Sequence, residues 1–324
     1  MVATLPATAF LIVSRILVRD GIGPQAVAVA GVSAPMFDEA FWKHWGDGRG
    51  ELSGYDLTFR RYGQPRKGVA VAVFVTETFS NTLRVKSDNG RHPVTDEFPV
   101  MKLNLVKDFP TGIYDYNLMT SAFVALAPVN GRPAGSTTKV SFSSQEWCGH
   151  VYAQLLFDAS SARLTSHSYF DGEADQERKV TVPAGALAGD AALLWARGLA
   201  APVLAPGERR EVPWMRSLLT SRVTHRPAVV TRATLARLGG TSRVTVPAGT
   251  FEVERRTVAI DGGATWTFVV EKAAPHRVVS WESSDGERAE LLASERLKYW
   301  EMNGPGGERA LARLGLRPRP LRTP

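Results

Sequence analysis

Short apolar segments separated by turn residues recur along most of this 324-residue chain, and this pattern constrains its fold more than any other feature. The segment 69–76 (VAVAVFVT) is rich in β-branched residues and is typical of a strand buried on both faces. Residues 100–109 and 113–126 flank Pro110-Thr111-Gly112, which predicts a hairpin with a tight loop. Similar segments follow after residue 139 and again after residue 209. Their spacing indicates an antiparallel meander rather than βαβ units.

Helical periodicity is confined to short stretches. The aromatic residues of segment 37–45 fall at helical spacing, which predicts a short amphipathic helix at one end of a sheet. Segment 190–199 (DAALLWARGL) has the clearest helical pattern, and Asp190 stands at its expected N-cap. Segment 308–316 is a further candidate for a short basic helix.

The predicted fold class is therefore mainly β, with two antiparallel sheet domains of open-barrel or sandwich-like form and one or two short helices. The first domain is expected at residues 35–183. A β-meander domain that begins with a helix is expected at 184–303, and a basic tail at 304–324. A chain of this length is compatible with one large or two smaller domains.

Residues 1–34 have some features of a leader peptide. Residues 3–13 are apolar but too few to span a bilayer, which needs about 20 residues. Arg15 and Arg19 follow this run, whereas signal peptides carry their positive charge before it. Small residues at 28–30 and 32–34 would suit cleavage. We expect a leader or a disordered N-terminus, and a periplasmic or outer-membrane-associated location, while a cytoplasmic location stays open.

The net charge of +7 is unevenly distributed, because many of the arginines lie between residues 209 and 256. A basic face favours anionic partners such as lipid head groups, polysaccharide or nucleic acid, although a solvated surface would have the same composition. Nucleic acid is not expected, because Trp214 is almost the only aromatic residue of this stretch that could stack on bases. Peripheral contact with a membrane is a further expectation.

Cys148 is the single cysteine, so no intramolecular disulfide can form. With His150 it is the best candidate for nucleophilic catalysis, because a thiolate needs a neighbouring base. On a regular strand, however, the two side chains would lie roughly 7 Å apart, and only a bulge at Gly149 would bring them together. The favoured interpretation is a buried structural cysteine.

No metal site or cofactor is predicted. Cys148, His150 and His167 would have to converge through the fold, because the sequence has no C-x-x-C or H-x-x-x-H spacing. His225 and His276 with acidic neighbours are a second candidate set. A cluster of Glu271, His276 and Glu282 fits a surface ion network as well as acid/base chemistry. Nucleotide-binding and serine-hydrolase motifs are absent from the sequence.

The predicted hairpin has one polar face. Side chains alternate along a strand, so Lys102 and Asn104 share a face, as do Asp115 and Asn117 on the partner strand. This polar face is either solvated or lines a hydrophilic groove. These four residues are the candidate ligand-binding residues.

The segment 244–292, which begins VTVPAGTFEVERRTVAIDGG, resembles, together with segment 190–199, an uncharacterised family of exported Gram-negative β proteins. In that family a V-P-A-G-T-F strand start precedes an aromatic-bearing strand and then a proline-marked strand. The first half, with SGYDLTFRRYG, FPTGIYDYNLMTS and SSQEWCGHVY, looks like its companion domain. The resemblance implies an envelope location and a two-part, open-barrel-like β fold, and it implies no catalytic residues.

The leading hypothesis is a non-enzymatic cell-envelope protein that binds a lipid-like ligand or an envelope partner in a groove of the sheet. One alternative is a thiol-dependent hydrolase or transferase that uses Cys148 and His150. Another is a structural assembly component with an exposed strand edge or apolar patch. The oligomeric state is not determined by the sequence.

Overall fold

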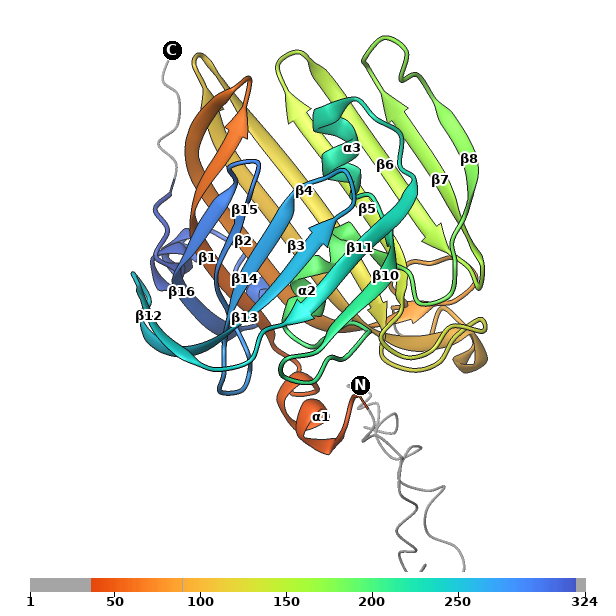
Figure 1. Cartoon of the computed structure of the whole chain (residues 1–324), viewed down its shortest axis with the longest axis horizontal. Coiled ribbons are helices and arrows are strands. Elements are labelled where there is room, and N and C mark those ends of the chain that lie inside the picture. Colours follow the sequence, from red (N-terminus) through yellow and green to blue (C-terminus); the bar gives the residue numbers. More distant parts are fainter. Residues whose placement is uncertain (1–35, 89, 319–324) are drawn as a thin grey trace, which may run out of the picture. The chain divides into compact units, whose positions relative to one another are not determined.

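A computed structural model describes residues 36–88 and 90–318 of the chain (Figure 1). The leader predicted for residues 1–34 and the last residues of the predicted basic tail lie outside this range. The described residues fall in one compact unit.

Sixteen strands make up most of the described residues. The strands are β1 (Gly50–Arg61), β2 (Gln64–Ser80), β3 (Glu97–Thr111), β4 (Tyr114–Ala125), β5 (Thr137–Glu146), β6 (Gly149–Phe157), β7 (Ser161–Ser168), β8 (Gln176–Thr181), β9 (Leu187–Ala188), β10 (Arg209–Met215), β11 (Val230–Arg237), β12 (Ser242–Val246), β13 (Gly249–Ile260), β14 (Thr265–Glu271), β15 (Val278–Ser283) and β16 (Arg288–Leu297). Strands such as β5 and β6 alternate in burial, as strands with one covered face do, whereas β1 and β4 have runs of buried residues.

All these strands belong to one sheet, in the order β8-β7-β6-β5-β4-β3-β2-β1-β16-β15-β14-β13-β11-β10-β9, with β12 added beside β13. Two meanders, β1 to β8 and β10 to β16, are joined where β1 pairs with β16 in antiparallel register. The pairing is antiparallel throughout except between β9 and β10. The sheet is open, with β8 and β9 at its two ends.

The predicted class, mainly β with an antiparallel open sheet and few short helices, is confirmed. The first meander lies within residues 35–183 and the second within residues 184–303. These meanders share one sheet and one hydrophobic core, which contains Leu57 and Phe142 from the first and Leu235 and Phe268 from the second. The physical reason is the pairing of β1 with β16, which continues the sheet across the expected boundary.

The helical elements are short. They are α1 (Glu39–Trp45), α2 (Ala192–Ala196), α3 (Leu218–Thr224), and the 3-10 turns η1 (Val94–Asp96), η2 (Gly189–Ala191), η3 (Tyr299–Glu301) and η4 (Gly307–Leu314). The helices predicted in segments 37–45, 190–199 and 308–316 are thus present in shorter form, the last as a 3-10 helix. Helix α3 was not predicted, although Ser217 caps it by accepting a hydrogen bond from the Thr220 N–H.

The segment between the two meanders packs against one face of the sheet, which we call the inner face. Residues of η2 contact β4 and β5, and α3 contacts β4, β5 and β6, while α2 contacts β14. Figure 1 shows α2 and α3 in front of the strands of the first meander. Asp190 does not cap α2 as expected. It lies in η2, and its carboxylate accepts a hydrogen bond from the Leu218 N–H at the start of α3.

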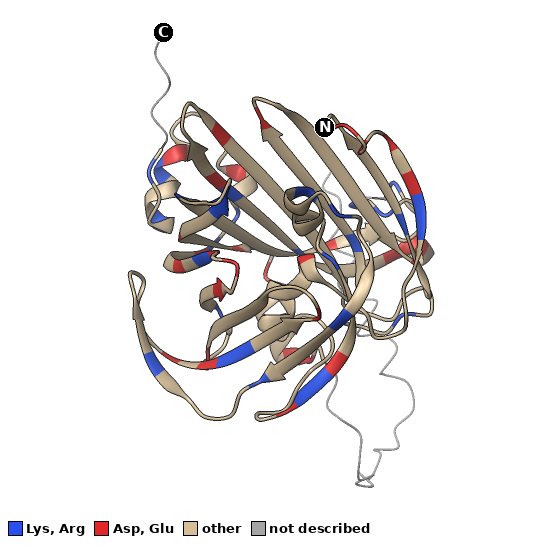
Figure 2. Ribbon diagram, turned by 45° about the horizontal axis from the view of Figure 1, so that its top comes forward, with Lys and Arg blue, Asp and Glu red and all other residues tan. Residues whose placement is uncertain are grey.

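The arginines between residues 209 and 256 do not form one free basic face. Arg222 is buried against Glu146, and Arg256 is buried against Glu254, which also receives hydrogen bonds from Arg237. Figure 2 shows blue and red residues alternating along the strands of the second meander. Arg222, Arg237 and Arg256 therefore serve internal ion pairs.

Candidate functional site: a cavity on the inner face of the sheet

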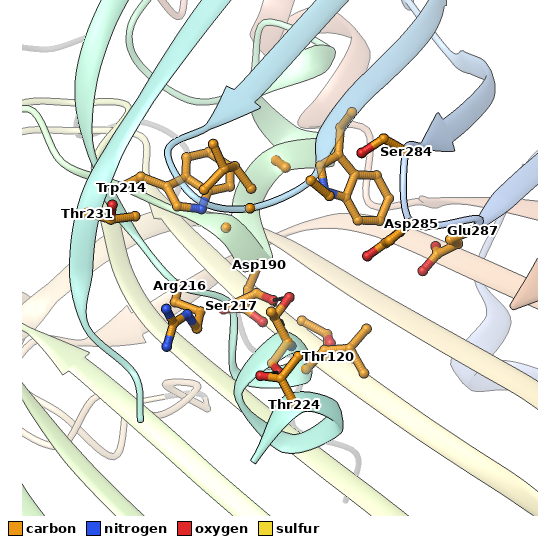
Figure 3. Close-up of a pocket in the computed structure, with 18 of the residues that line it drawn as sticks. Thr120, Asp190, Trp214, Arg216, Ser217, Thr224, Thr231, Ser284, Asp285 and Glu287 are labelled. Atoms are coloured by element: carbon orange, nitrogen blue, oxygen red, sulfur yellow. Dashed lines mark hydrogen bonds between the residues drawn. The ribbon is translucent and has the colours of Figure 1, made fainter. Parts of the chain in front are cut away.

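A cavity of about 380 Å³ lies between the inner face of the first meander and the second meander (Figure 3). Strands β3 and β4 supply Leu105, Lys107 and Thr120 to its wall. The opposite wall comes from η2, α3, β10 and β11, and from the turns that follow β13 and β15. Segments far apart in the sequence thus enclose one volume.

Large apolar side chains form most of the wall. Four aromatic residues, Trp214, Trp266, Phe268 and Trp281, line the cavity together with Leu105 and Leu193. The Trp266 and Phe268 rings are stacked, with centroids 6.2 Å apart. Aromatic and aliphatic walls with a few polar groups are typical of sites for small organic ligands. The cavity volume falls at the lower end of the ~300–1,000 Å³ that such sites occupy.

A buried ion pair forms one polar part of the wall. Lys107 Nζ lies 2.6 Å from Glu287 Oε1, and the Trp281 indole Nε1–H donates to the same oxygen at 2.8 Å. Both charged side chains are almost fully buried. Within the described part of the chain, Glu287 Oε2 has no hydrogen-bond donor. Because Glu287 lines the cavity, this oxygen is available to a ligand.

Asp190 is the second polar group of the wall. Asp190 is buried, and its two carboxylate oxygens lie 3.2 and 3.1 Å from the Leu218 amide nitrogen. Burial raises the pKa of the Asp190 carboxyl to about 7, and the hydrogen bond from Leu218 opposes part of this effect. The raised pKa favours the protonated carboxyl, which can donate a hydrogen bond as well as accept one. Figure 3 shows Asp190 near the centre of the site, with Asp285 and Glu287 to one side and Arg216 to the other.

The rim of the cavity is polar and more exposed. Arg226, Asp261 and Asp285 are exposed, whereas Arg216 is half-buried and donates from Nη1 to the Pro227 carbonyl at 2.9 Å. Asp261 is paired with Arg232, with Nε and Oδ2 3.0 Å apart. The rim carries both positive and negative groups, so it selects no single ligand charge.

A second cavity of about 240 Å³ lies on another side of α3, against β6 and β7. Three of its charged or titratable residues, Arg222, Glu173 and His225, have protein partners. Arg222 Nη2 donates to Glu146 Oε1 at 2.8 Å, and His225 Nδ1 lies 2.5 Å from Glu173 Oε1. The larger cavity, with its aromatic wall and its open carboxylate oxygen, is therefore the candidate site.

The four predicted ligand-binding residues lie on the other face of the hairpin. Leu105 and Lys107 line the cavity, so the alternating residues Lys102 and Asn104 lie on the outer face of β3. Asp115 and Asn117 likewise alternate with Thr120, which lines the cavity from β4.

Neighbouring side chains hold these outer-face residues. Lys102 Nζ donates to Glu77 at 3.0 Å, and Asn104 Oδ1 accepts from Ser121 at 2.7 Å. Asn117 Nδ2 donates to Asp108 at 2.6 Å. None of the four candidates lines the cavity described above.

Cys148 is exposed, so the interpretation as a buried structural cysteine is wrong. The physical reason is its place in the two-residue turn between β5 and β6, where Glu146 pairs with Gly149 and the side chains leave the sheet. His150 is also exposed and pairs with Gln145 across the hairpin. No hydrogen bond between Cys148 and His150 is present among the described residues.

The other candidates for metal or acid/base chemistry are not brought together. Glu271 binds Arg277 through two hydrogen bonds of 2.8 and 2.9 Å, and His276 Nδ1 lies near the Glu271 carbonyl rather than its carboxylate. Glu282 is exposed on β15. Among residues 36–88 and 90–318, no group of three or more His, Cys, Asp or Glu side chains is placed to hold a metal ion. No helix in that range is long and apolar enough to cross a bilayer.

Sequence reasoning missed Lys107, Asp190 and Glu287 as site residues. Lys107 interrupts the apolar alternation of β3 at a position where the neighbours on its face, Leu105 and Phe109, are apolar. A charge on an otherwise apolar strand face is a signal of a buried polar group that has a partner. Asp190 and Glu287 lie beside turns, and their sequence surroundings give no comparable signal.

Comparisons with known proteins add little. No family model matches the chain, and no curated protein matches it. One solved structure is similar, a beta-barrel-like protein of domain of unknown function DUF1849 from Brucella abortus. It shares 12% sequence identity at a TM-score of 0.45, and the match covers 76% of this chain and 98% of that chain. This is a weak resemblance to an uncharacterised β protein of a Gram-negative bacterium.

Proposed function

We propose that this protein is a non-enzymatic binding protein for a small lipid-like ligand, held in the inner cavity. The observation that carries the proposal is a cavity of about 380 Å³ with an aromatic and aliphatic wall and a buried polar group at Glu287. The volume suits one chain of a single-chain amphiphile rather than a two-chain lipid.

The buried charges support a ligand with a neutral polar end. Lys107 and Glu287 cancel each other, and burial raises the pKa of Asp190, which favours its neutral form. A ligand that carried a full charge would place it beside groups that are already paired, and it would lose its hydration without gaining a counter-charge. A hydroxyl, amide or ester can donate to Glu287 Oε2 and exchange hydrogen bonds with Asp190 without that loss.

The apolar wall supports an acyl or similar body. Trp214, Trp266 and Phe268 present rings that would bury apolar ligand surface, at about 25 cal/mol per Å² removed from water. Their indole and phenyl groups keep defined positions with few rotatable bonds, so little conformational entropy is lost on binding.

The test uses a monoacylglycerol with a medium-length acyl chain, below its micelle concentration, in equilibrium dialysis against the purified full-length protein. We expect saturable binding to one site. Leu105→Trp fills the cavity from β3 and should weaken binding at least about tenfold. Val106→Trp is the matched control, because the adjacent side chain of the same strand lies on the outer face, and its affinity should stay unchanged.

An equal loss of affinity in Leu105→Trp and Val106→Trp would overturn the proposal. Absence of binding to both the monoacylglycerol and the corresponding fatty acid would overturn it too. Tighter binding of the fatty acid than of the monoacylglycerol would keep the cavity as a lipid site and correct the chemistry of the polar end. Thermal unfolding of each variant checks that both remain folded.

An envelope location is part of this proposal and depends on the sequence of residues 1–34 and on the family resemblance. The thiol-dependent alternative has no supporting geometry at Cys148, whose side chain is exposed in a hairpin turn and does not line the cavity. Transport of a lipid-like ligand between membranes would need a binding protein of this kind, and it would also need a means of meeting a membrane.

A further inference from the structure

The hairpin tips of the first meander carry large apolar residues where turns normally carry polar ones. The β1–β2, β3–β4 and β5–β6 hairpins have two-residue loops, Tyr62-Gly63, Gly112-Ile113 and Trp147-Cys148. Asn, Asp and Gly dominate such loops in most proteins. Here Tyr62 is 54%, Ile113 77% and Trp147 65% exposed. Tyr169, which is 72% exposed, follows β7 at the same end of the sheet.

These side chains form one continuous row, which we call the tip rim and define as Tyr62, Ile113, Tyr114, Trp147 and Tyr169. The Tyr114 hydroxyl donates to the Tyr62 hydroxyl at 3.4 Å, and the Tyr114 and Trp147 rings are stacked with centroids 6.1 Å apart. The row continues to Tyr169, whose ring lies directly over Gly149, so a Cβ at position 149 would meet it at 2.4 Å. Three hairpins and the following loop thus present one aromatic edge.

The backbone of the β1–β2 turn is strained at Tyr62, so an aromatic residue at this tip costs conformational free energy. Tyr62 has φ +55° and Gly63 has φ +72°, as in a type I′ turn, where asparagine is the favoured first residue. A bulky side chain in the left-handed region is rare. The ring is more than half exposed, so packing explains only part of this choice. Such strain is commonly kept at functional positions.

Positive charge accompanies the rim at its first hairpin. Arg60, Arg61, Arg66 and Lys67 surround this turn, and Asp56 lies 3.9 Å from Lys67. Arg61 lies over the Tyr62 ring at 4.4 Å. Acidic residues Asp171, Glu173 and Asp175 lie in the loop after β7, at the far end of the row. Basic residues therefore gather at the first hairpin, and acidic residues gather at the far end of the row.

The rim and the cavity opening lie at the same end of the sheet. In an antiparallel meander the β1–β2, β3–β4 and β5–β6 turns share one end, and β16 pairs with β1, so the β15–β16 turn lies there too. A Cβ at Gly286 in that turn would lie 3.5 Å from the Arg60 side chain. Asp285 and Glu287 of the same turn line the cavity.

We propose that the tip rim docks this protein on the head-group region of a lipid bilayer. Trp and Tyr prefer that region, because a ring can enter the apolar boundary while its polar atom stays hydrated. The basic residues of the β1–β2 hairpin would add electrostatic attraction to anionic lipids, but only at that end of the rim. The exposed apolar edge is otherwise unfavourable for a monomer in water. Docking in this orientation faces the cavity opening toward the bilayer, although it does not depend on what the cavity holds.

The first experiment is co-sedimentation of the full-length protein with vesicles of phosphatidylcholine, and of phosphatidylcholine with 30% phosphatidylglycerol as an order-of-magnitude anionic content for a bacterial membrane. The rim variant is Tyr62→Asn/Ile113→Asn/Trp147→Ser, which restores ordinary turn residues and should keep or raise thermal stability. We expect its partitioning to fall about tenfold or more, because each lost side chain removes apolar surface from the contact.

The matched control is Val94→Asn. Val94 is 78% exposed in η1, between β2 and β3 and therefore at the opposite end of the sheet. This substitution should leave partitioning unchanged. Equal partitioning of the wild type and the rim variant would overturn the proposal, and so would an equal loss in the control.

Cys148 allows a second readout, because it is the single cysteine and lies exposed in the rim turn beside Trp147. A polarity-sensitive fluorophore on Cys148 should shift to shorter wavelength when vesicles are added. The same fluorophore in Cys148→Ser/Val94→Cys should not shift. A concentration-dependent shift without vesicles, together with dimer in sedimentation, would instead assign the rim to self-association and overturn the bilayer proposal.

Discussion

Two buried ion pairs in this protein have different surroundings. Arg197, just after α2, donates to both oxygens of Glu51 in β1 at 2.6 and 3.2 Å, and also to the carbonyls of Pro275 and His276 at 2.9 and 3.2 Å. Its guanidinium lies over the Phe74 ring at 4.3 Å. The pair therefore joins both meanders and leaves no oxygen of Glu51 unbound.

Lys107 and Glu287 also join the two meanders, but their bonds converge on one oxygen, and Oε2 of Glu287 remains at the cavity. Burial alone therefore does not distinguish a structural charge from a ligand-binding one. The distinction is whether the protein itself supplies all the hydrogen bonds that the charge requires. The following changes test this difference, beginning with the largest expected effect.

Glu51→Ala should destabilise the fold by about 3–5 kcal/mol, because it leaves the Arg197 guanidinium buried without a counter-charge. The free energy of unfolding from urea titration measures this. Glu51→Gln, which keeps one acceptor oxygen, should cost less. A loss below about 1 kcal/mol for Glu51→Ala would show that water reaches Arg197 and that the two pairs are alike.

Lys107→Met should cost less stability, about 1–2 kcal/mol, because Glu287 keeps the Trp281 donor and can be hydrated from the cavity. The same change should weaken monoacylglycerol binding, since an unpaired carboxylate makes the polar end of the cavity anionic and hydrated. Lys102→Met on the outer face of β3, which breaks the contact with Glu77, is the control and should leave binding unchanged. Loss of binding in both Lys107→Met and Lys102→Met would show that the inner and outer faces of β3 do not differ in ligand binding.

Substitution of Asp190 should have the smallest effect on the free energy of unfolding, and this effect should depend on pH. The folded-state pKa of Asp190, about 7, lies above the ordinary value of 3.8, so the folded protein binds more protons between these values. Its contribution therefore makes stability fall as pH rises from about 4 to 7, with a slope that approaches about 1.4 kcal/mol per pH unit. Asp190→Asn should remove this contribution and stabilise the protein relative to wild type at pH 8 more than at pH 4. Parallel stability profiles would contradict the raised pKa.

Hairpins and strands were predictable because they depend on local pattern. The loop around Pro110-Thr111-Gly112 and the apolar run 69–76 lie in a hairpin and a strand as expected. The same pattern did not predict which face of the β3–β4 hairpin lines the cavity. Alternation separates Lys102 and Asn104 from Leu105 and Lys107, but it does not say which set faces the core. That depends on the segment between the meanders, which covers one face only.

Residues in turns were the least predictable. Cys148 reads as a small apolar residue within a strand-like stretch, yet a two-residue turn exposes it. Asp190 reads as an N-cap, yet its carboxylate binds an amide of α3, 28 residues later. Both outcomes depend on register and on contacts distant in sequence, which local propensity does not encode.

The sequence by itself determined that this chain forms an antiparallel β meander with few short helices, because the period of the apolar residues and the turn residues between them are local properties. Only the tertiary structure decided that β1 pairs with β16, that both meanders share one core, and that Lys107, Asp190 and Glu287 meet at one cavity. The physical reason is that these contacts join residues far apart in the sequence, and their free energy comes from burial and pairing that exist only after the chain has folded.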